Sequence, residues 1–203
     1  MIGWLKENRL KLVSILCVLG DMLMGVAGAV GLYHLGKNFA DLLMTGAAFL
    51  GLFGHSIVII WGKGGEAKHG QVHAAQQISI FLKPLFMWRY PLDASFAVFS
   101  VGGFIFAIAG ATSHNPPLVL FGVIGCGAAL LGWLWPQDRP LFGFRSLQVC
   151  AILYTVSGIA SIASGLWAHS LYIFLAGCCY ISANIIFSTV RKQNQSQYTI
   201  DQV

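Results

Sequence analysis

Two ionisable side chains, Asp21 and His55, interrupt otherwise apolar stretches of the sequence. A charge inside a membrane-spanning helix is costly unless it is paired, so such residues point to function. An aspartate beside a histidine can relay protons, because the carboxylate moves the titration of the imidazole across the physiological pH range. The alternative is that Asp21 accepts hydrogen bonds from Ser or Tyr hydroxyls of a neighbouring helix. The sequence leaves both interpretations open.

Other polar side chains lie in the last third of the chain. Ser157, Ser161 and Ser164 follow the spacing that places residues on one helical face. Hydrogen bonds between helices explain such serines. The alternative is a polar-lined cavity that reaches Asp21 and His55. The candidate intramembrane polar site therefore comprises the following residues: Asp21, His55, Asn184, Ser157, Ser161 and Tyr154.

Three histidines follow a glycine at breaks between apolar stretches. They are His34 in GLYHLG (31–36), His114 in GATSHN (110–115) and His169 in GLWAHS (165–170). If they converge, three imidazoles make a metal or proton site. The alternative is three ordinary histidines at the membrane interface. The sequence does not indicate whether a metal, haem or other cofactor is bound.

The composition identifies the solvent of this chain. Of its 203 residues 57% are hydrophobic and only 9% are charged, with a mean hydropathy of +0.73. A soluble domain carries about 25% charged residues. We therefore expect an integral membrane protein whose main partner is the lipid bilayer. A second copy of the chain or another membrane protein is a further candidate partner.

Six apolar stretches are long enough to cross a bilayer, which takes about 20 residues. Lipid supplies no hydrogen-bond partners to an open sheet edge, so we expect helices and an all-α fold. We read 1–203 as one membrane domain with three antiparallel hairpins. The expected spans are about 12–33, 41–61, 94–112, 117–135, 148–168 and 170–190.

Two segments lie outside these spans. Val72, Ala75, Ile78 and Leu82 follow helical spacing before Pro84, and an aromatic and basic cluster comes next. We expect an amphipathic helix at the membrane interface over about 71–90. The segment 193–203 is a polar tail.

Lysine and arginine are distributed unevenly between the two sides. Eleven of the 12 fall on one side of the expected topology, and Lys37 alone falls on the other. This bias predicts that both termini face the cytoplasm. The net charge of +5 thus reflects topology and contact with anionic lipid rather than nucleic acid. We expect a cell membrane, in our interpretation the bacterial inner membrane.

The expected topology places Asp21 and His55 at similar depth. At 1.5 Å per residue, their distances from the inner ends of two antiparallel helices differ by only about 5 Å. A contact between the two side chains is therefore expected. At the outer start of the second span, Asn38 or Asp41 is expected to cap the helix.

Short similar stretches suggest an internal repeat. GAAFLG (46–51), GAALLG (127–132) and GCCYIS (177–182) fall at matching places in the second helix of each expected hairpin. The first helix of each is rich in small residues, which let helices approach closely. A triplication and a chance similarity of Gly- and Ala-rich spans both explain this pattern.

Three functions fit these features. The first is a small transporter or channel for a small solute or ion, since buried polar groups and repeats are common in transporters. The second is an accessory or assembly subunit of a larger membrane complex. The third is a membrane-embedded redox or haem protein. The chain shows no nucleophile elbow or phosphate-binding loop. An enzyme is therefore the less favoured class.

The closing stretch GLWAHSLYIFLAGCCYISANIIFSTVRK carries a resemblance. It is similar to the closing helices of the PQ-loop sugar transporters, the SWEET and SemiSWEET families, with Asn184 in a polar position. The dipeptide Pro136-Gln137 is also present. The six expected spans depart from the three-helix units of those families. The resemblance implies transport.

Overall fold

The computed structural model describes residues 2–34, 38–61, 91–134, 140–141 and 144–200, and the side chains of 12–33, 38–57, 95–134 and 149–186. This part of the chain is almost entirely helical. Two short strands, β1 (Pro140–Leu141) and β2 (Phe144–Arg145), pair antiparallel just before α6. The helices are α1 (Ile2–His34), α2 (Phe39–Trp61), α4 (Pro91–Thr112), α5 (Pro116–Leu134), α6 (Ser146–Trp167) and α7 (Leu171–Ile200).

The expected all-helical membrane fold is confirmed. Among the described residues, five helices are long and apolar enough to span a membrane. The described apolar part of α7, Leu171–Ile186, is shorter, so the sixth span stays a prediction. Helix α7 continues through most of the expected polar tail. The expected interfacial helix over 71–90 lies outside the described residues.

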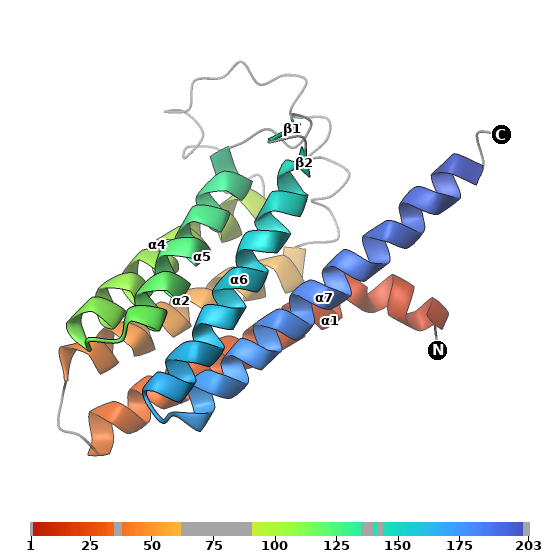
Figure 1. Ribbon diagram of the computed structural model, residues 1–203. Helices are drawn as coiled ribbons and strands as arrows, with labels where there is room; N and C mark the ends of the chain where they lie inside the picture. The colour runs from red at the N-terminus through yellow and green to blue at the C-terminus, as the bar shows by residue number, and fades with distance from the viewer. Residues whose placement is uncertain (1, 35–37, 62–90, 135–139, 142–143, 201–203) are drawn as a thin grey trace.

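The helices form a closed ring. Each one packs on the next along the chain, and α7 packs on α1 (Figure 1). The turn-linked pairs α4–α5 and α6–α7 are in contact. Helices α2 and α4 are also in contact, and so are α5 and α6. The contacts therefore do not divide the ring into separate pairs, and the arrangement as three hairpins stays a prediction.

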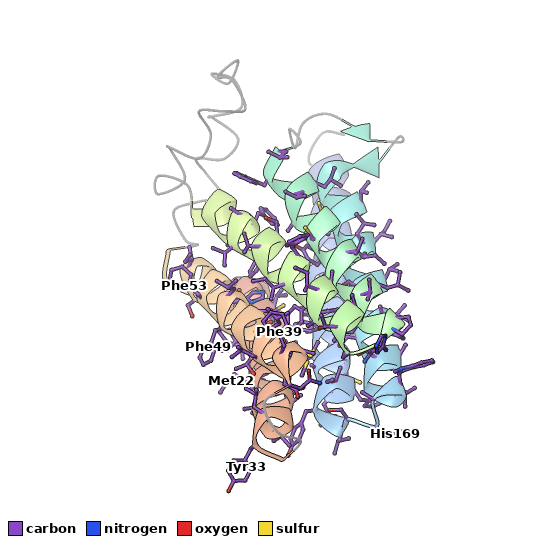
Figure 2. The ribbon with its side chains drawn as sticks, turned by 90° about the vertical axis from the view of Figure 1, so that its left-hand side faces the viewer. Met22, Tyr33, Phe39, Phe49, Phe53 and His169 are labelled. Atoms are coloured by element: carbon purple, nitrogen blue, oxygen red, sulfur yellow. The ribbon has the colours of Figure 1, made fainter. Side chains whose placement is uncertain are left out.

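The outer surface of the ring is apolar. Met22, Phe49 and Phe53 project from it (Figure 2) and are more than half exposed, at 52%, 66% and 54%. Large apolar side chains spread over a whole helical surface are costly in water and suited to lipid. This surface is the face that the composition predicts for contact with the bilayer.

Two turns explain the recurring Gly and His. His114 and His169 both have φ of 51°, the left-handed conformation that ends many helices. In each turn the residue after the histidine donates its backbone N–H to the glycine carbonyl: Asn115 to Gly110 at 2.9 Å and Ser170 to Gly165 at 2.8 Å. The similar sequences therefore reflect the same helix-ending motif.

The caps of the following helices agree with the sequence. Asn115 Oδ1 accepts a bond from the Leu118 N–H at 3.1 Å, and Pro116 is the first residue of α5. At the start of α2, Asn38 Oδ1 accepts from Ala40 N–H at 3.2 Å. Of the two expected caps, Asn38 is thus the one that makes this bond.

One close backbone approach recurs in three helix pairs, α1–α2, α4–α5 and α6–α7. A Cβ atom on the first-helix glycine would lie 3.0 Å or less from the backbone nitrogen of a residue on the second helix. The pairs are Gly28 with Thr45, Gly110 with Val119, and Gly165 with Phe174. In this register 46–51 matches 120–125 and 175–180. This register differs from the expected matches to 127–132 and 177–182, and the internal repeat itself stays a prediction.

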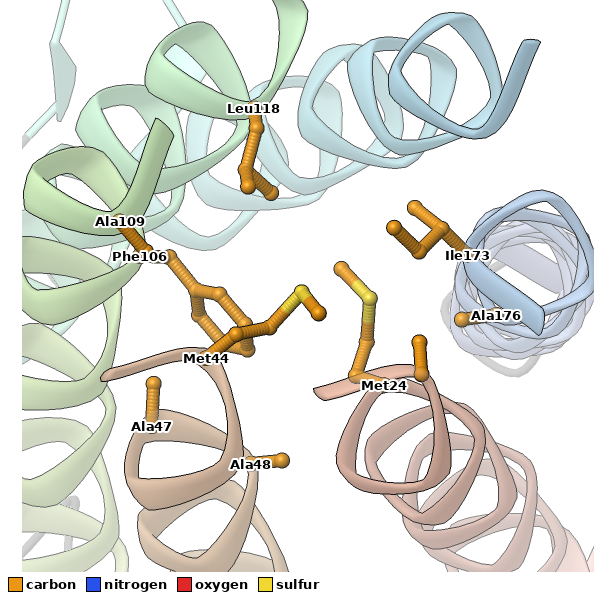
Figure 3. Packing of buried hydrophobic residues seen from close by; sticks show 10 residues of the cluster. Met24, Met44, Ala47, Ala48, Phe106, Ala109, Leu118, Ile173 and Ala176 are labelled. Atoms are coloured by element: carbon orange, nitrogen blue, oxygen red, sulfur yellow. The ribbon is translucent and has the colours of Figure 1, made fainter. Parts of the chain in front are cut away.

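The buried apolar side chains meet on the axis of the ring. Met24, Met44, Phe106, Leu118 and Ile173 come from five helices and point toward one another (Figure 3), each no more than 6% exposed. Alanines from the same helices complete this core cluster. The cluster lies in the half of the ring that ends in the turns at His114 and His169. The cluster fills the centre of the ring in that half.

We expect Gly110→Ala to destabilise the protein. The added methyl group would collide with the backbone of α5 at Val119, and overpacking of this kind costs about 1–3 kcal/mol. Thermal unfolding of the purified protein in detergent measures the change. The matched control is Gly127→Ala, because a Cβ at Gly127 meets no atom within 4 Å. Equal stability of the two variants would contradict the close approach.

Candidate functional site

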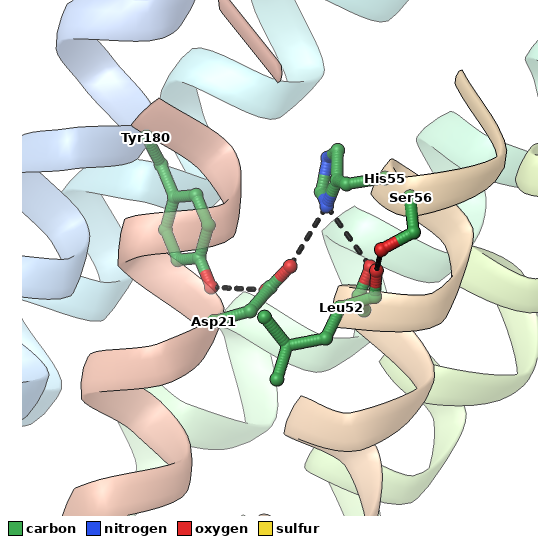
Figure 4. Close-up of polar contacts among 6 residues, drawn as sticks. Asp21, Leu52, His55, Ser56 and Tyr180 are labelled. Carbon is green, nitrogen blue, oxygen red and sulfur yellow. Dashed lines mark hydrogen bonds and ion pairs between the residues drawn. The ribbon is translucent and has the colours of Figure 1, made fainter. Parts of the chain in front are cut away.

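Asp21 is a buried carboxylate with a partner at each oxygen. Its Oδ1 accepts a hydrogen bond from the Tyr180 hydroxyl at 2.7 Å, and its Oδ2 lies 2.7 Å from Nδ1 of His55 (Figure 4). Three helices, α1, α2 and α7, are thereby joined through one residue. Gly51 on α2 makes room, since a Cβ there would overlap the carboxylate.

The bonds of His55 define which ring nitrogen carries a proton. Its Nδ1 faces the Asp21 carboxylate and, at 3.0 Å, the carbonyl of Gly51. Both are acceptors, so Nδ1 is protonated and donates. The other nitrogen, Nε2, lies on the side away from Asp21 (Figure 4). Gain or loss of a proton at Nε2 therefore changes the charge of the pair without breaking its hydrogen bond.

Aromatic rings extend this network around the ring of helices. The Phe99 ring of α4 lies 4.4 Å from the His55 ring, centroid to centroid. On the other side, Phe121 of α5 stacks on Tyr180 at 5.7 Å and meets Phe106 edge-on at 5.1 Å. Ring contacts and hydrogen bonds thus form a band through α4, α5, α7, α1 and α2.

The band lines a central cavity of about 260 Å³. All six helices contribute to its wall, which is largely aromatic, Gly and Ala. Asp21 and His55 are the wall's carboxylate and imidazole, and none of the described lining residues is Lys or Arg. The cavity lies beside the core cluster, in the half of the ring toward the start of α1 and the end of α2.

Helix α6 adds one unsatisfied polar atom to the cavity wall. The Tyr154 hydroxyl is buried and has no hydrogen-bond partner within the described structure. A buried hydroxyl without a partner costs about 1–3 kcal/mol. Tyr154 lines the cavity together with Cys150 and Ser157. Its hydroxyl is therefore a polar group that the fold itself does not use.

The serines of α6 serve mainly to join helices. Ser157 and Ser161 donate to the carbonyls of Phe121 and Ile173, at 2.9 and 3.2 Å. Ser164 accepts from the Asn115 side chain at 3.0 Å. Of the three, only Ser157 is among the residues of the cavity wall. Hydrogen bonding between helices, one of the two expected roles, describes Ser161 and Ser164.

The structure brings most of the predicted polar residues together. Asp21, His55, Tyr154, Ser157 and Asn184 line one cavity, and Ser161 does not. The Asn184 side chain donates to the Tyr180 carbonyl at 3.0 Å. That these residues form a functional site remains a proposal, argued below.

The outer histidines lie away from this cavity. His114 and His169 are exposed in the turns between helices, and His169 lies at the same end of the ring as Tyr33 (Figure 2). The side chain of His34 is outside the described residues. Among the side chains that the structure describes, no three of His, Cys, Asp and Glu gather as a metal site. The three-histidine site stays a prediction.

The Asp–His pair lies within one copy of the recurring helix pair, and its partner Tyr180 comes from another copy. Two helical turns before each glycine of the close backbone approach lies a residue of the cavity wall. These residues are Asp21 before Gly28, Gly103 before Gly110, and Gly158 before Gly165. The positions that match His55 hold Ala129 and Asn184, and those that match Tyr180 hold Gly51 and Gly125. The same backbone packing is thus achieved elsewhere without a carboxylate at the position of Asp21 or an imidazole at the position of His55.

Tyr180 and the aromatic wall are the parts of the site that the sequence did not reveal. Tyr180 lies one turn before Asn184, so both share a helical face, and this spacing was the available signal. The phenylalanines gave no comparable signal, because aromatic residues are common on every face of these helices.

Comparisons of the chain with models of protein families, with curated proteins and with solved structures give no match. The resemblance to the PQ-loop sugar transporters stays a prediction. The geometry of the cavity therefore carries the functional argument.

We expect Asp21 and Tyr180 to be energetically coupled. Tyr180→Phe removes a hydrogen bond to a buried carboxylate, which contributes about 1.5–3 kcal/mol. In an Asp21→Asn background the same change should cost less, because the acceptor is neutral. A double-mutant cycle of unfolding free energies in detergent measures the coupling.

The control for this cycle is Tyr172→Phe, since Tyr172 is exposed near the start of the same helix. It should leave stability unchanged in both backgrounds. Purely additive effects of the Asp21 and Tyr180 changes would contradict the hydrogen bond.

Proposed function

We propose that the protein is a small membrane transporter that carries a small solute or ion through its central cavity. The observation that carries the proposal is the wall of this cavity, to which all six helices contribute and in which Asp21 and His55 are paired. Transporters place polar groups near the middle of the bilayer, where helices from different repeats meet. A cavity in the centre of the ring can change its access when the helices move against one another.

The position of the core cluster supports transport by alternating access. The cluster fills the axis on one side of the cavity with apolar side chains from five helices. Phe106 belongs both to the cluster and to the cavity wall. Separation of these side chains would connect the cavity to the opposite membrane face. Met24 and Met44 suit such a contact, because methionine adapts its shape easily.

The polar network supports a function beyond folding. Gly103 and Gly158 occupy the positions that match Asp21, and Ala129 and Asn184 occupy those that match His55. A buried ion pair is weak evidence for stability, since apolar residues of similar volume often replace it without loss. Retention of the carboxylate in one place only is therefore better explained by what the cavity binds.

We also propose which membrane face the cavity is nearer. The excess of Lys and Arg at one side indicates that both termini are cytoplasmic, in a cell membrane that we interpret as the bacterial inner membrane. The cavity, which lies toward the start of α1, is then nearer the cytoplasmic face, and the core cluster is nearer the outer face.

We expect Gly125→Phe to abolish transport. Gly125 lines the cavity, so a benzyl group there fills the space that the solute needs. The measurement is uptake of a panel of radiolabelled small solutes by vesicles that contain the purified protein, with a trapped pH-sensitive dye to follow protons. The variant should fall to the level of protein-free vesicles.

The matched control is Gly127→Phe on the same helix. Gly127 is exposed, and a Cβ there meets no neighbour, so the added ring projects outward. This variant should transport like the wild type. Transport that survives in Gly125→Phe would show that the solute takes another route, and no flux of any solute by the wild type would overturn the proposed function.

A further inference from the structure

We propose that the cavity binds a small organic monocation of the alkylammonium class at Asp21, in exchange for a proton from His55. The inference rests on the proposed function and deepens it, because it names the substrate class and the coupling ion. It follows from the charges, the aromatic walls and the unsatisfied hydroxyl of this one cavity.

The charges in the wall favour a cation. The titratable side chains that line the cavity are Cys17 and Asp21 from α1, His55 from α2, Cys150 and Tyr154 from α6, and Tyr180 from α7; the described lining residues of α4 and α5 contribute none. Asp21 is the carboxylate among them. An anionic solute would meet this carboxylate with no Lys or Arg in the described wall to balance it.

The aromatic wall favours an organic cation over a metal ion or a sugar. Phe96, Phe99, Phe106, Phe121 and Tyr180 line the same cavity as the carboxylate. Aromatic faces attract alkylammonium groups, which are poorly hydrated and gain from ring contact. A sugar needs many hydrogen-bond partners, and this wall is mostly apolar, so a neutral polyol would lose more hydration than it regains.

Tyr154 supplies a second polar contact. This residue lines the cavity, and its buried hydroxyl has no partner in the described structure. A hydroxyl or a carbonyl on the solute can satisfy it. The preferred ligand therefore combines one positive charge at Asp21 with one hydrogen-bonding group toward α6.

The exchange follows from charge balance. With His55 protonated at both nitrogens, the Asp21–His55 pair is neutral. A cation that enters beside Asp21 places two positive charges at one carboxylate, which is costly where water is scarce. The Nε2–H bond of His55 then breaks and the proton leaves to water, while Nδ1–H stays bonded to Asp21. One cation enters, one proton leaves, and the net charge of the site is unchanged.

The test is calorimetric binding of choline to the full-length protein in lipid nanodiscs, in two buffers of different ionisation enthalpy. The neutral analogue 3,3-dimethylbutanol has the same shape without the charge. We expect choline to bind with release of up to one proton, more weakly as the pH falls, and the neutral analogue to bind at least tenfold more weakly. Equal binding of the two probes, or no binding of choline, overturns the inference.

Three variants separate the roles of the pair. Asp21→Asn should weaken choline binding at least tenfold, whereas Asp41→Asn, a carboxylate outside the cavity wall, should not. His55→Gln should still bind choline, but with no proton release and no dependence on pH. Unchanged affinity in Asp21→Asn, or unchanged proton release in His55→Gln, overturns the inference. If Asp21→Asn does not fold, the His55→Gln measurement still decides.

The same measurements separate this inference from the proposed function. Flux of other solutes by a protein that does not bind choline would leave transport standing and overturn the cation site. Choline binding with proton release, but without flux in vesicles, would support the site and overturn transport.

Discussion

A single buried carboxylate sets the constraints on the centre of this protein. Asp21 lies in a membrane-spanning helix with 6% of its side chain exposed, where an unpaired charge is very costly. The Tyr180 hydroxyl and the His55 imidazole meet its two oxygens, and Gly51 leaves the space that this requires. Because these partners come from α2 and α7, the carboxylate also fixes how the two neighbours of α1 sit around it.

The scaffold and the polar network follow different rules. Gly28, Gly110 and Gly165 make the same close backbone approach in three helix pairs, so the packing repeats. The network occurs once, with Gly103 and Gly158 at the places that match Asp21. A repeated scaffold tends to give a symmetric cavity, and a single carboxylate makes that cavity asymmetric. The asymmetry gives the cavity a definite place for one charge.

The sequence was sufficient for the class of fold and for the polar pair, and insufficient for the cavity. Hydropathy and length located the helices, because a bilayer demands long apolar segments whatever they pack against. Depth along two antiparallel helices was enough to bring Asp21 and His55 together. The sequence did not predict the role of Tyr180, because its partner Asp21 is far away in the chain and tyrosines are common in such helices. The repeat register also required coordinates, since small residues recur at many spacings and only a backbone contact distinguishes them.

The cavity and the core cluster are in direct contact. Phe106 contributes to both, so in the proposed transporter a bound solute would touch the core cluster. The aromatic contacts from Phe106 through Phe121 to Tyr180 then lead to Asp21. Tyr180 donates its hydrogen bond to the carboxylate of the Asp21–His55 pair, and the Phe121 ring that stacks on Tyr180 lies directly against Phe106. The Asp21–His55 pair and the core cluster are therefore joined by a short series of direct contacts. In the proposed transport cycle, these contacts offer a physical route from the charged pair to the core cluster.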